Sequence, residues 1–197
     1  MILYLHGFRS SPDSFKARLV ARKMAALGRL PELVCPQLPA SPREAMALAL
    51  ALIGDTPADR LAIVGSSLGG YYATWLAEQF GCRAVLLNPA VSPLNELERH
   101  VGVTTAWHSD QPFEFKRAYI DELRALKVAR ITRLERYFLI AASGDEVLDY
   151  RTMLAHYAGA RQHVIDGSDH ALADFADHVD AVLAFCLASR VAEVAPQ

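Results

Sequence analysis

One short segment of this sequence, Gly65-Ser66-Ser67-Leu68-Gly69, has the pattern G-x-S-x-G. In that pattern the central serine sits at a sharp turn between a strand and a helix, and the glycines avoid a steric clash. A serine hydroxyl is a poor nucleophile until a base removes its proton, and an acid must orient that base. We therefore expect Ser67 to be a nucleophile, and we expect a histidine and a carboxylate elsewhere in the chain to activate it.

Asp145 and His170 have the positions that this chemistry requires. They follow Ser67 in the order serine, acid, histidine, which is the order typical of this type of elbow. Each also comes shortly after a predicted strand, Asp145 after 137–142 and His170 after 162–165. We therefore expect Asp145 to be the orienting acid and His170 to be the base.

Other carboxylates and histidines are weaker candidates for these two roles. Asp149 lies beyond the predicted end of its strand, and Asp166 and Asp169 would crowd the loop of the histidine itself. His163 falls inside the last predicted strand. The remaining histidines of this region and of the insertion described below lack a matching placement; they are His100, His108, His156 and His178.

Acyl transfer through a serine produces an oxyanion, which two backbone N–H groups usually stabilise. Leu68 supplies one of them by its position after the nucleophile. The second is expected from Phe8, because His6-Gly7-Phe8 follows the first strand and is similar to the HG element of lipases and esterases. His6 is then expected to organise this loop and not to act as a base. The alternative is that His6 makes only a local hydrogen bond.

Strands and helices alternate along the chain and would bring these residues together. Such alternation predicts an α/β fold with a mostly or wholly parallel sheet of about six strands and helices on both faces, in which chemistry gathers at the carboxyl ends of the strands. The predicted strands are Ile2–Leu5, Leu33–Cys35, Arg60–Val64, Cys82–Leu87, Tyr137–Ala142 and Gln162–Ile165, and the predicted helices are Ser14–Leu27, Ser41–Ile53, Leu68–Phe80, Tyr150–Tyr157 and Leu172–Leu187.

Between residues 90 and 135 this regular pattern loosens. We expect a single domain over 1–190, with 90–135 as an insertion that either caps the site or adds a surface helix ending near Leu126. Tyr71, Tyr72 and the aromatics of the insertion are candidates for an acyl pocket or for the core. Residues 191–197 are expected to be a frayed tail.

Composition narrows the class of protein further. The chain has 197 residues and a formal net charge of −2, with 52% hydrophobic residues. This balance argues against a nucleic-acid partner, and the absence of a long apolar run argues against integral membrane association and favours the cytoplasm. Cys35, Cys82 and Cys186 are too widely spaced for a metal site and are expected to be reduced thiols.

The motifs resemble those of the α/β-hydrolase superfamily, and more closely those of its small bacterial YqiA/YcfP-type esterases. The resemblance spans nearly the whole chain and rests on Met1–Phe8, Gly65–Trp75, Leu87–Ala90, Gly144–Tyr150 and Gly167–His170. It implies a minimal α/β-hydrolase fold with esterase or acyl thioesterase activity and no metal or organic cofactor. Carried over to this chain, it makes Ser67 the nucleophile, Asp145 the acid and His170 the base.

The sequence departs from the family pattern in two places. Ala171 follows the histidine where relatives often have serine, and 141–143 is less polar than usual before Gly144-Asp145. These departures affect the expected substrate and not the reaction type. We therefore expect a serine esterase or thioesterase acting on a small-molecule acyl ester or thioester; an acyltransferase with the same residues, or a non-catalytic binding module of this fold, is the alternative.

Overall fold

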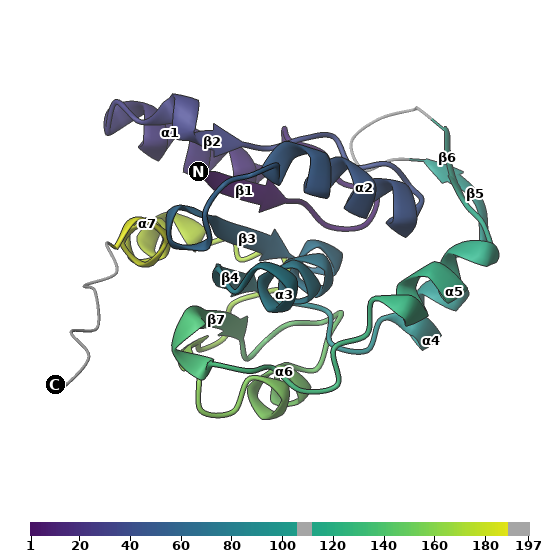
Figure 1. The fold of residues 1–197 in the computed structure, drawn as a ribbon. Coiled ribbons are helices and arrows are strands. Elements are labelled where there is room, and N and C mark those ends of the chain that lie inside the picture. Colours follow the sequence, from purple (N-terminus) through teal and green to yellow (C-terminus); the bar gives the residue numbers. More distant parts are fainter. Residues whose placement is uncertain (106–111, 189–197) are drawn as a thin grey trace, which may run out of the picture.

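A computed structural model describes residues 1–105 and 112–188, and it contains a wholly parallel six-stranded sheet with the strand order β2-β1-β3-β4-β7-β8 (Figure 1). The expected number and direction of the strands are thus confirmed. His108 and the predicted tail 191–197 lie outside the described residues. The strands are β1 (Ile2–Leu5), β2 (Leu33–Val34), β3 (Ala62–Ser66), β4 (Arg83–Leu87), β7 (Tyr137–Ala142) and β8 (Arg161–Ile165).

Helices cover both faces of the sheet. On one face lie α1 (Phe15–Ala26) and α7 (Val179–Leu187), and on the other lie α2 (Pro42–Ile53), α3 (Leu68–Phe80) and α6 (Tyr150–His156). Single-turn 3₁₀ helices precede three of the strands and α7. They are Leu30–Glu32, Ala58–Arg60, Leu134–Arg136 and Phe175–Asp177.

The central strands are apolar on both faces, which explains why they read as uninterrupted hydrophobic runs. In β7, Leu139 faces the core under α3 and α6, whereas Phe138 and Ile140 face the core under α1 and α7, and none of the three is more than 2% exposed. Because successive side chains point to opposite faces, one strand contributes to two separate cores. The sheet is therefore a rigid base for the loops at its carboxyl edge.

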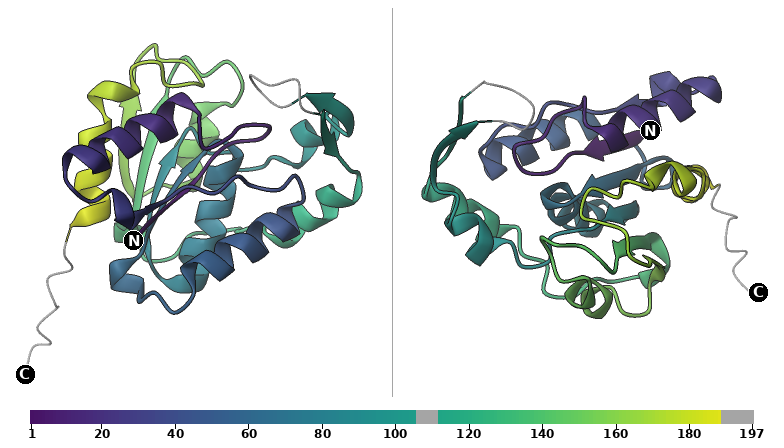
Figure 2. Two further views of the ribbon diagram at one scale, coloured as in Figure 1. Left: turned by 90° about the horizontal axis from the view of Figure 1, so that it is seen from above. Right: turned by 180° about the vertical axis from the view of Figure 1, so that it is seen from behind.

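The insertion contains more structure than the sequence predicts. It forms α4 (Leu94–Glu98), an antiparallel hairpin of β5 (Gly102–Thr105) and β6 (Pro112–Phe115), and α5 (Ala118–Ala125). This unit lies at the margin of the molecule opposite α7 (Figures 1 and 2). The hairpin is missed by sequence reasoning because it lies outside the main sheet and its exposed positions include apolar residues such as Val103.

The final helix begins later than predicted. A helix over Leu172–Leu187 is wrong, because Leu172 has a φ of 54° and only Val179–Leu187 forms the α-helix. The side chain of Leu172 is fully buried in the core, but its backbone lies in a turn before the helix. The Asp169 side chain stabilises this turn by accepting a hydrogen bond from the Ala173 N–H. Elsewhere the predicted ends are shifted by a few residues; β3, for instance, begins at Ala62 because Ala58–Arg60 is a 3₁₀ turn.

Glu122 fastens the insertion to the body of the protein. Its carboxylate accepts hydrogen bonds from the Ser41 hydroxyl at 2.7 Å and from the Arg43 N–H at 3.0 Å, both at the start of α2. Ser41 is also the expected N-cap, and its Oγ accepts from the Glu44 N–H at 3.2 Å. A carboxylate at a helix N-terminus satisfies free N–H groups and interacts favourably with the helix dipole.

Replacing Glu122 by glutamine should lower the free energy of unfolding by about 1–2 kcal/mol, because the charge-assisted bonds to Ser41 and Arg43 are weakened. Asp121→Asn is the matched control: Asp121 lies on the same helix, but its side chain is 78% exposed and its one ion-pair partner among residues 1–105 and 112–188 is Arg124. We expect the control to cost no more than about 0.5 kcal/mol. Urea unfolding of the two variants measures the difference, and equal losses would contradict the role assigned to Glu122.

Candidate active site

Ser67 occupies a strained turn between β3 and α3. Its φ of 54° and ψ of −120° are unfavourable for a residue with a side chain, at a cost of about 1–3 kcal/mol. Three backbone hydrogen bonds hold the turn: the Ser67 N–H donates to the Leu87 carbonyl at 3.0 Å, and the Ser67 carbonyl accepts from Gly70 and Ala90 at 2.9 and 3.0 Å. The hydroxyl is thus presented at the carboxyl edge of the sheet.

The two glycines of the motif are required by close backbone approach. A β-carbon at Gly69 would lie 2.0 Å from the carbonyl oxygen of Leu5, and one at Gly65 would lie 2.3 Å from the carbonyl oxygen of Gly69. Neither contact can be relieved by a side-chain rotation, because both partners are backbone atoms. Gly69 therefore lets the first turn of α3 pack directly on β1, and Gly65 lets it pack directly on β3.

Ser67, His170 and Asp145 form an unbroken chain of hydrogen-bonding contacts. The Oγ of Ser67 lies 3.1 Å from Nε2 of His170, and Nδ1 of His170 lies 2.8 Å from Oδ2 of Asp145. The Asp145 side chain is fully buried, whereas the His170 side chain is 20% exposed. The structure thus brings together the three residues that the sequence analysis singled out.

The surroundings of Asp145 define which nitrogen of His170 carries the proton. Oδ1 of Asp145, the oxygen that does not face His170, accepts hydrogen bonds from the N–H groups of Val147 and Leu148, each at 2.8 Å. Because an ionised carboxylate can only accept hydrogen bonds, we assign the ring proton to Nδ1 of His170, which then donates to Oδ2 of Asp145. Nε2 is then free to accept from the Ser67 hydroxyl, which is the arrangement needed to remove the serine proton.

Asn88, at the end of β4, links the loops that carry Asp145 and His170. Its side-chain amide donates to the carbonyls of Asp169 and His170 at 3.0 and 3.1 Å, and its Oδ1 accepts from the Ala142 N–H at 2.8 Å. Asn88 is fully buried, with a φ of 42°. The sequence predicts no role for Asn88, which falls within the resemblance segment Leu87–Ala90. The signal for its role is its complete burial, and burial at a strand end cannot be predicted from one sequence.

Lys16 of α1 adds a positive charge beside the same loop. Its Nζ donates to the Ala171 carbonyl at 2.7 Å. Burial lowers the pKa of Lys16 to about 8, and the nearby carboxylates of Asp169 and Asp145 oppose this shift. Ala171, at the position where relatives often have serine, thus contacts Lys16 through its backbone carbonyl.

The loop after β1 lies directly against the serine. A β-carbon at Gly7 would be 3.2 Å from Cβ of Ser67, so there is little room for a side chain at that position. Phe8 follows, and across the described residues its N–H makes no hydrogen bond. Leu68 is the first residue of α3, so its N–H has no partner within the helix. Two free N–H groups therefore flank the serine.

His6 connects this loop to the segment after β2. Its Nε2 accepts a hydrogen bond from the Leu38 N–H at 3.0 Å, and its Nδ1 lies 3.0 Å from the Gly7 carbonyl. This pattern fits the neutral ring with the proton on Nδ1. His6 is 4% exposed, and burial lowers its pKa, with the Gly7 hydrogen bond acting in the opposite direction.

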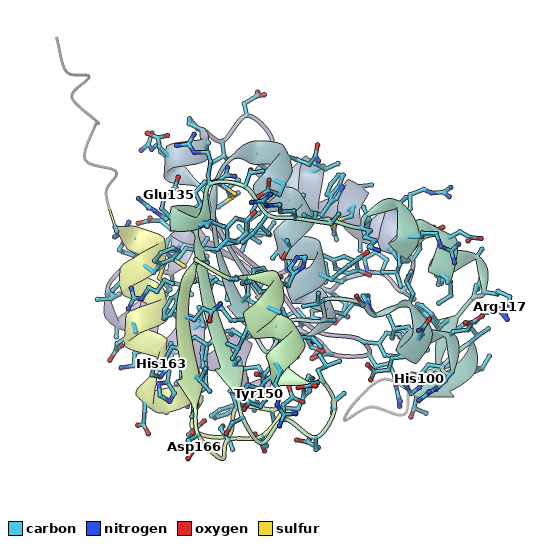
Figure 3. All side chains as sticks on the ribbon, turned by 90° about the horizontal axis from the view of Figure 1, so that it is seen from below. His100, Arg117, Glu135, Tyr150, His163 and Asp166 are labelled. Atoms are coloured by element: carbon cyan, nitrogen blue, oxygen red, sulfur yellow. The ribbon has the colours of Figure 1, made fainter. Side chains whose placement is uncertain are left out.

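The alternative acids and histidines have other partners. Asp149 caps α6 by accepting from the Arg151 N–H, Asp166 accepts from the Ser143 hydroxyl, and Asp169 accepts from Ala173. His163 lies in β8 beside α7, where its ring is 5.0 Å from that of His178. Figure 3 shows Tyr150 and Asp166 at the carboxyl edge of the sheet and Glu135 at the opposite end.

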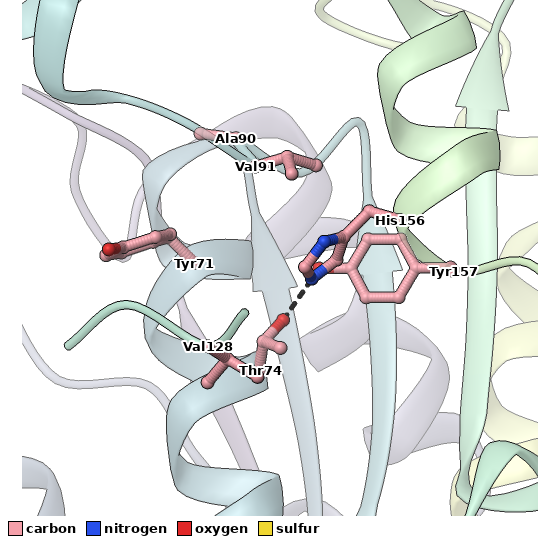
Figure 4. A pocket seen from close by; sticks show the side chains of 7 residues that line it. All are labelled: Tyr71, Thr74, Ala90, Val91, Val128, His156 and Tyr157. Atoms are coloured by element: carbon pink, nitrogen blue, oxygen red, sulfur yellow. Dashed lines mark hydrogen bonds between the residues drawn. The ribbon is translucent and has the colours of Figure 1, made fainter. Parts of the chain in front are cut away.

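Two hollows lie near the elbow. One is a shallow depression next to the loop after β1, and it is lined by Phe8, Leu38, Leu68, Tyr72 and Phe113 among others. The second lies between α3 and α6, where the hydroxyls of Thr74 and Tyr157 are 2.7 Å apart and His156 and Tyr71 contribute to the wall (Figure 4). The first hollow is therefore the one adjacent to the free N–H groups of Phe8 and Leu68.

Two features are absent from the part of the chain that the structure describes. No group of three or more His, Cys, Asp or Glu side chains in it is arranged to hold a metal ion. No helix in it has the length and apolar character needed to cross a bilayer.

The parallel sheet, the strained elbow and the order of the loops define an α/β-hydrolase fold. The chain belongs to the family described as Uncharacterised protein family (UPF0227), whose model matches residues 1–187, and this confirms the resemblance inferred from the sequence. Solved structures with this fold include Est1E from Butyrivibrio proteoclasticus with ferulic acid bound, with a TM-score of 0.67, 15% identity, and coverage of 95% of this chain and 88% of that one.

Two further structures show how widely the fold is used. The mouse alpha/beta hydrolase domain-containing protein 10 matches with a TM-score of 0.66 and 16% identity over 92% of this chain and 88% of its own. A variant of tomato methylketone synthase I in complex with β-ketoheptanoate matches with a TM-score of 0.69 and 14% identity over 94% of this chain and 96% of its own. Similarity at this level establishes the fold, and the reaction must be argued from the site.

Replacing Asn88 by alanine should loosen the loop that carries His170 and lower the free energy of unfolding by about 2–4 kcal/mol, because the buried Ala142 N–H and two carbonyls lose their partner. Amide hydrogen exchange of residues 168–173 should become faster well below the unfolding transition. Asn95→Ala, on the exposed face of α4, is the control and should change neither quantity. Unchanged exchange in the Asn88 variant would show that the loop does not depend on this side chain.

Stability should fall as the pH is lowered through the usual His pKa of 6.5, because His6 stays neutral when folded but binds a proton when unfolded. For one such group the slope reaches at most about 1.4 kcal/mol per pH unit. His156, whose pKa burial also lowers, acts in the same direction. His6→Gln should therefore reduce the slope of unfolding free energy between pH 8 and 5 without abolishing it. An unchanged slope would contradict the buried neutral state of His6.

Proposed function

We propose that this protein is a serine hydrolase that cleaves carboxylic esters or acyl thioesters. The single observation that carries the proposal is the unbroken contact chain from Ser67 through His170 to the buried Asp145, located at a strained elbow. A serine in a structural turn needs neither a histidine at hydrogen-bonding distance nor a buried carboxylate behind it. Together these features match the requirements for an activated nucleophile.

In the first half of the reaction, Ser67 Oγ attacks the carbonyl carbon of the substrate while His170 Nε2 takes the hydroxyl proton. The resulting tetrahedral intermediate has an oxyanion, which we assign to the N–H groups of Phe8 and Leu68. When the intermediate collapses, the bond to the alcohol or thiol breaks and His170 returns its proton to the leaving group. An acyl-enzyme on Ser67 remains.

In the second half, water replaces the alcohol or thiol. His170 takes a proton from the water, whose oxygen attacks the acyl carbon, and then returns that proton to Ser67 Oγ as the acid product leaves. Asp145 holds the His170 ring in the required tautomer and stabilises the imidazolium that forms in each half. Because Asp145 is fully buried and Val147 and Leu148 donate to it, its carboxylate has little freedom to move away from His170.

The hollow beside Phe8 and Leu68 is our assignment for the acyl group. Tyr72 and Phe113 form part of its wall, so this wall offers apolar contacts to an acyl group bound at the elbow. The bound ferulic acid in Est1E is a carboxylic acid, the class of product that an ester hydrolase releases, and it is held by a protein of the same fold. We expect the reaction to need no resident metal or cofactor and to take place in the cytoplasm.

The proposal predicts that Ser67→Ala abolishes hydrolysis of nitrophenyl esters and acyl thioesters, with a loss of at least about 10³-fold in kcat. Ser92→Ala, an exposed serine in the loop after β4, is the control and should keep full activity. Both variants are compared by steady-state kinetics after circular dichroism has shown that they are folded. Wild-type turnover that survives in Ser67→Ala would overturn the proposal.

Added alcohol or thiol acceptors separate the two possible fates of the acyl-enzyme. If water is the natural acceptor, the acid remains the main product when an acceptor is present at millimolar concentration. If the ester of the added alcohol or the thioester of the added thiol dominates instead, the protein is an acyltransferase that uses the same residues.

A further inference from the structure

Three aromatic rings of the insertion enclose the side chain of Phe8. The ring of Phe8 lies 5.2 Å from Phe113 and 5.1 Å from Phe115, both in edge-to-face geometry, and 5.6 Å from His100. Edge-to-face pairs of this kind are favourable beyond simple burial, because the positive edge of one ring meets the negative face of the other. The side chain next to the proposed oxyanion donor is thus held by a part of the chain more than ninety residues away.

Phe115 is the member of this group with the firmest support. It is 1% exposed, and its ring also packs 5.5 Å from Tyr119 at the start of α5. Helix α5 is fixed in turn, because Glu122 binds the start of α2 and the Tyr71 hydroxyl donates to the Leu123 carbonyl at 2.9 Å. Phe8 therefore rests on an element that is anchored to both α2 and α3.

Arg9 provides a second connection from the same loop to the insertion. Its Nε donates to the Thr105 carbonyl of β5 at 2.6 Å. Arg9 also has a φ of 58°, a conformation that costs energy in a residue with a side chain and so needs support from its surroundings. The ring contacts hold the side chain of Phe8, and the Arg9 bond holds the backbone that follows it.

At its other end, the loop is fixed by the body of the protein. His6 binds the Leu38 N–H, and Gly7 packs against Ser67. The N–H of Phe8 lies between these two attachments. Because a donor contributes to transition-state stabilisation only at hydrogen-bonding distance from the oxyanion, a displacement of about 1 Å at this point has a large effect on rate.

We propose that Phe115 and Arg9 are positioning residues that hold the Phe8 N–H in the oxyanion hole, so that contacts with the insertion complete this hole. This inference rests on the proposed hydrolase function. Phe115 acts through the ring of Phe8 and Arg9 through the backbone after it, and neither residue is assigned a contact with the oxyanion. Their effect should therefore appear in transition-state binding and not in ground-state binding.

The test uses the full-length protein, a nitrophenyl ester and a trifluoromethyl ketone, which adds Ser67 reversibly and places an oxyanion at the same position. Phe115→Leu removes the ring contact and keeps an apolar side chain. It should lower kcat about 10- to 100-fold and raise the inhibition constant of the ketone by a similar factor, while KM changes less than about threefold. Arg9→Lys, which keeps the charge but loses Nε, should act in the same direction and decides the question if Phe115→Leu does not fold.

Phe138→Leu is the matched control. Phe138 is also buried, at 2% exposure, but it lies near the start of β7, at the opposite end of the sheet from Ser67, in the core under α1 and α7. The Phe138→Leu variant should lose about as much free energy of unfolding as Phe115→Leu, without a change in kcat or in the inhibition constant of the ketone. If Phe115→Leu and Arg9→Lys match the wild type or the control, or if only KM changes, the positioning role is wrong. If the wild type itself neither hydrolyses esters nor binds the ketone, the proposed function fails, and this inference falls with it.

Discussion

The arrangement of this protein depends on how closely the first turn of α3 approaches β1. At Gly69 the backbone lies so near the Leu5 carbonyl that a β-carbon would be only 2.0 Å from the oxygen. This contact forces the chain to turn within two residues of β3, and the strain is concentrated at Ser67. The Ser67 N–H donates to the Leu87 carbonyl and the Ser67 carbonyl accepts from the Ala90 N–H, so the conformation of the serine is coupled to β4 and the loop that follows.

The remaining contacts extend this coupling along the carboxyl edge of the sheet. Asn88 follows the strand that supports Ser67, and its side chain reaches the end of β7 and the loop of His170. The neighbouring loop holds Asp145 by backbone N–H groups. A parallel sheet brings these loops together automatically, but a buried amide is needed to fix their separation to within a hydrogen-bond length. On the other side of Ser67, we infer that the ring contacts of Phe8 fix the position of the loop after β1.

Much of this arrangement can be predicted from the sequence because it follows from strand order. Apolar runs identify the six strands, and residues at their carboxyl ends must meet, so the proximity of Ser67, Asp145 and His170 is predictable, while their catalytic roles stay predictions. The role of Asn88 is not predictable, because an asparagine at a strand end normally indicates a turn. The early start predicted for the last helix fails for a related reason: Leu172 is apolar and buried, yet its backbone is left-handed, and hydrophobic periodicity does not report backbone angles.

The central claim is that Ser67 is activated by its neighbours, and covalent labelling tests it without knowledge of the substrate. The folded protein is treated with a fluorophosphonate, which reacts with activated serines, and the modified peptide is identified by mass spectrometry. We predict a single adduct on Ser67 that is absent in His170→Ala. A folded wild-type protein that remains unlabelled, or one that is labelled equally well without His170, would contradict the account.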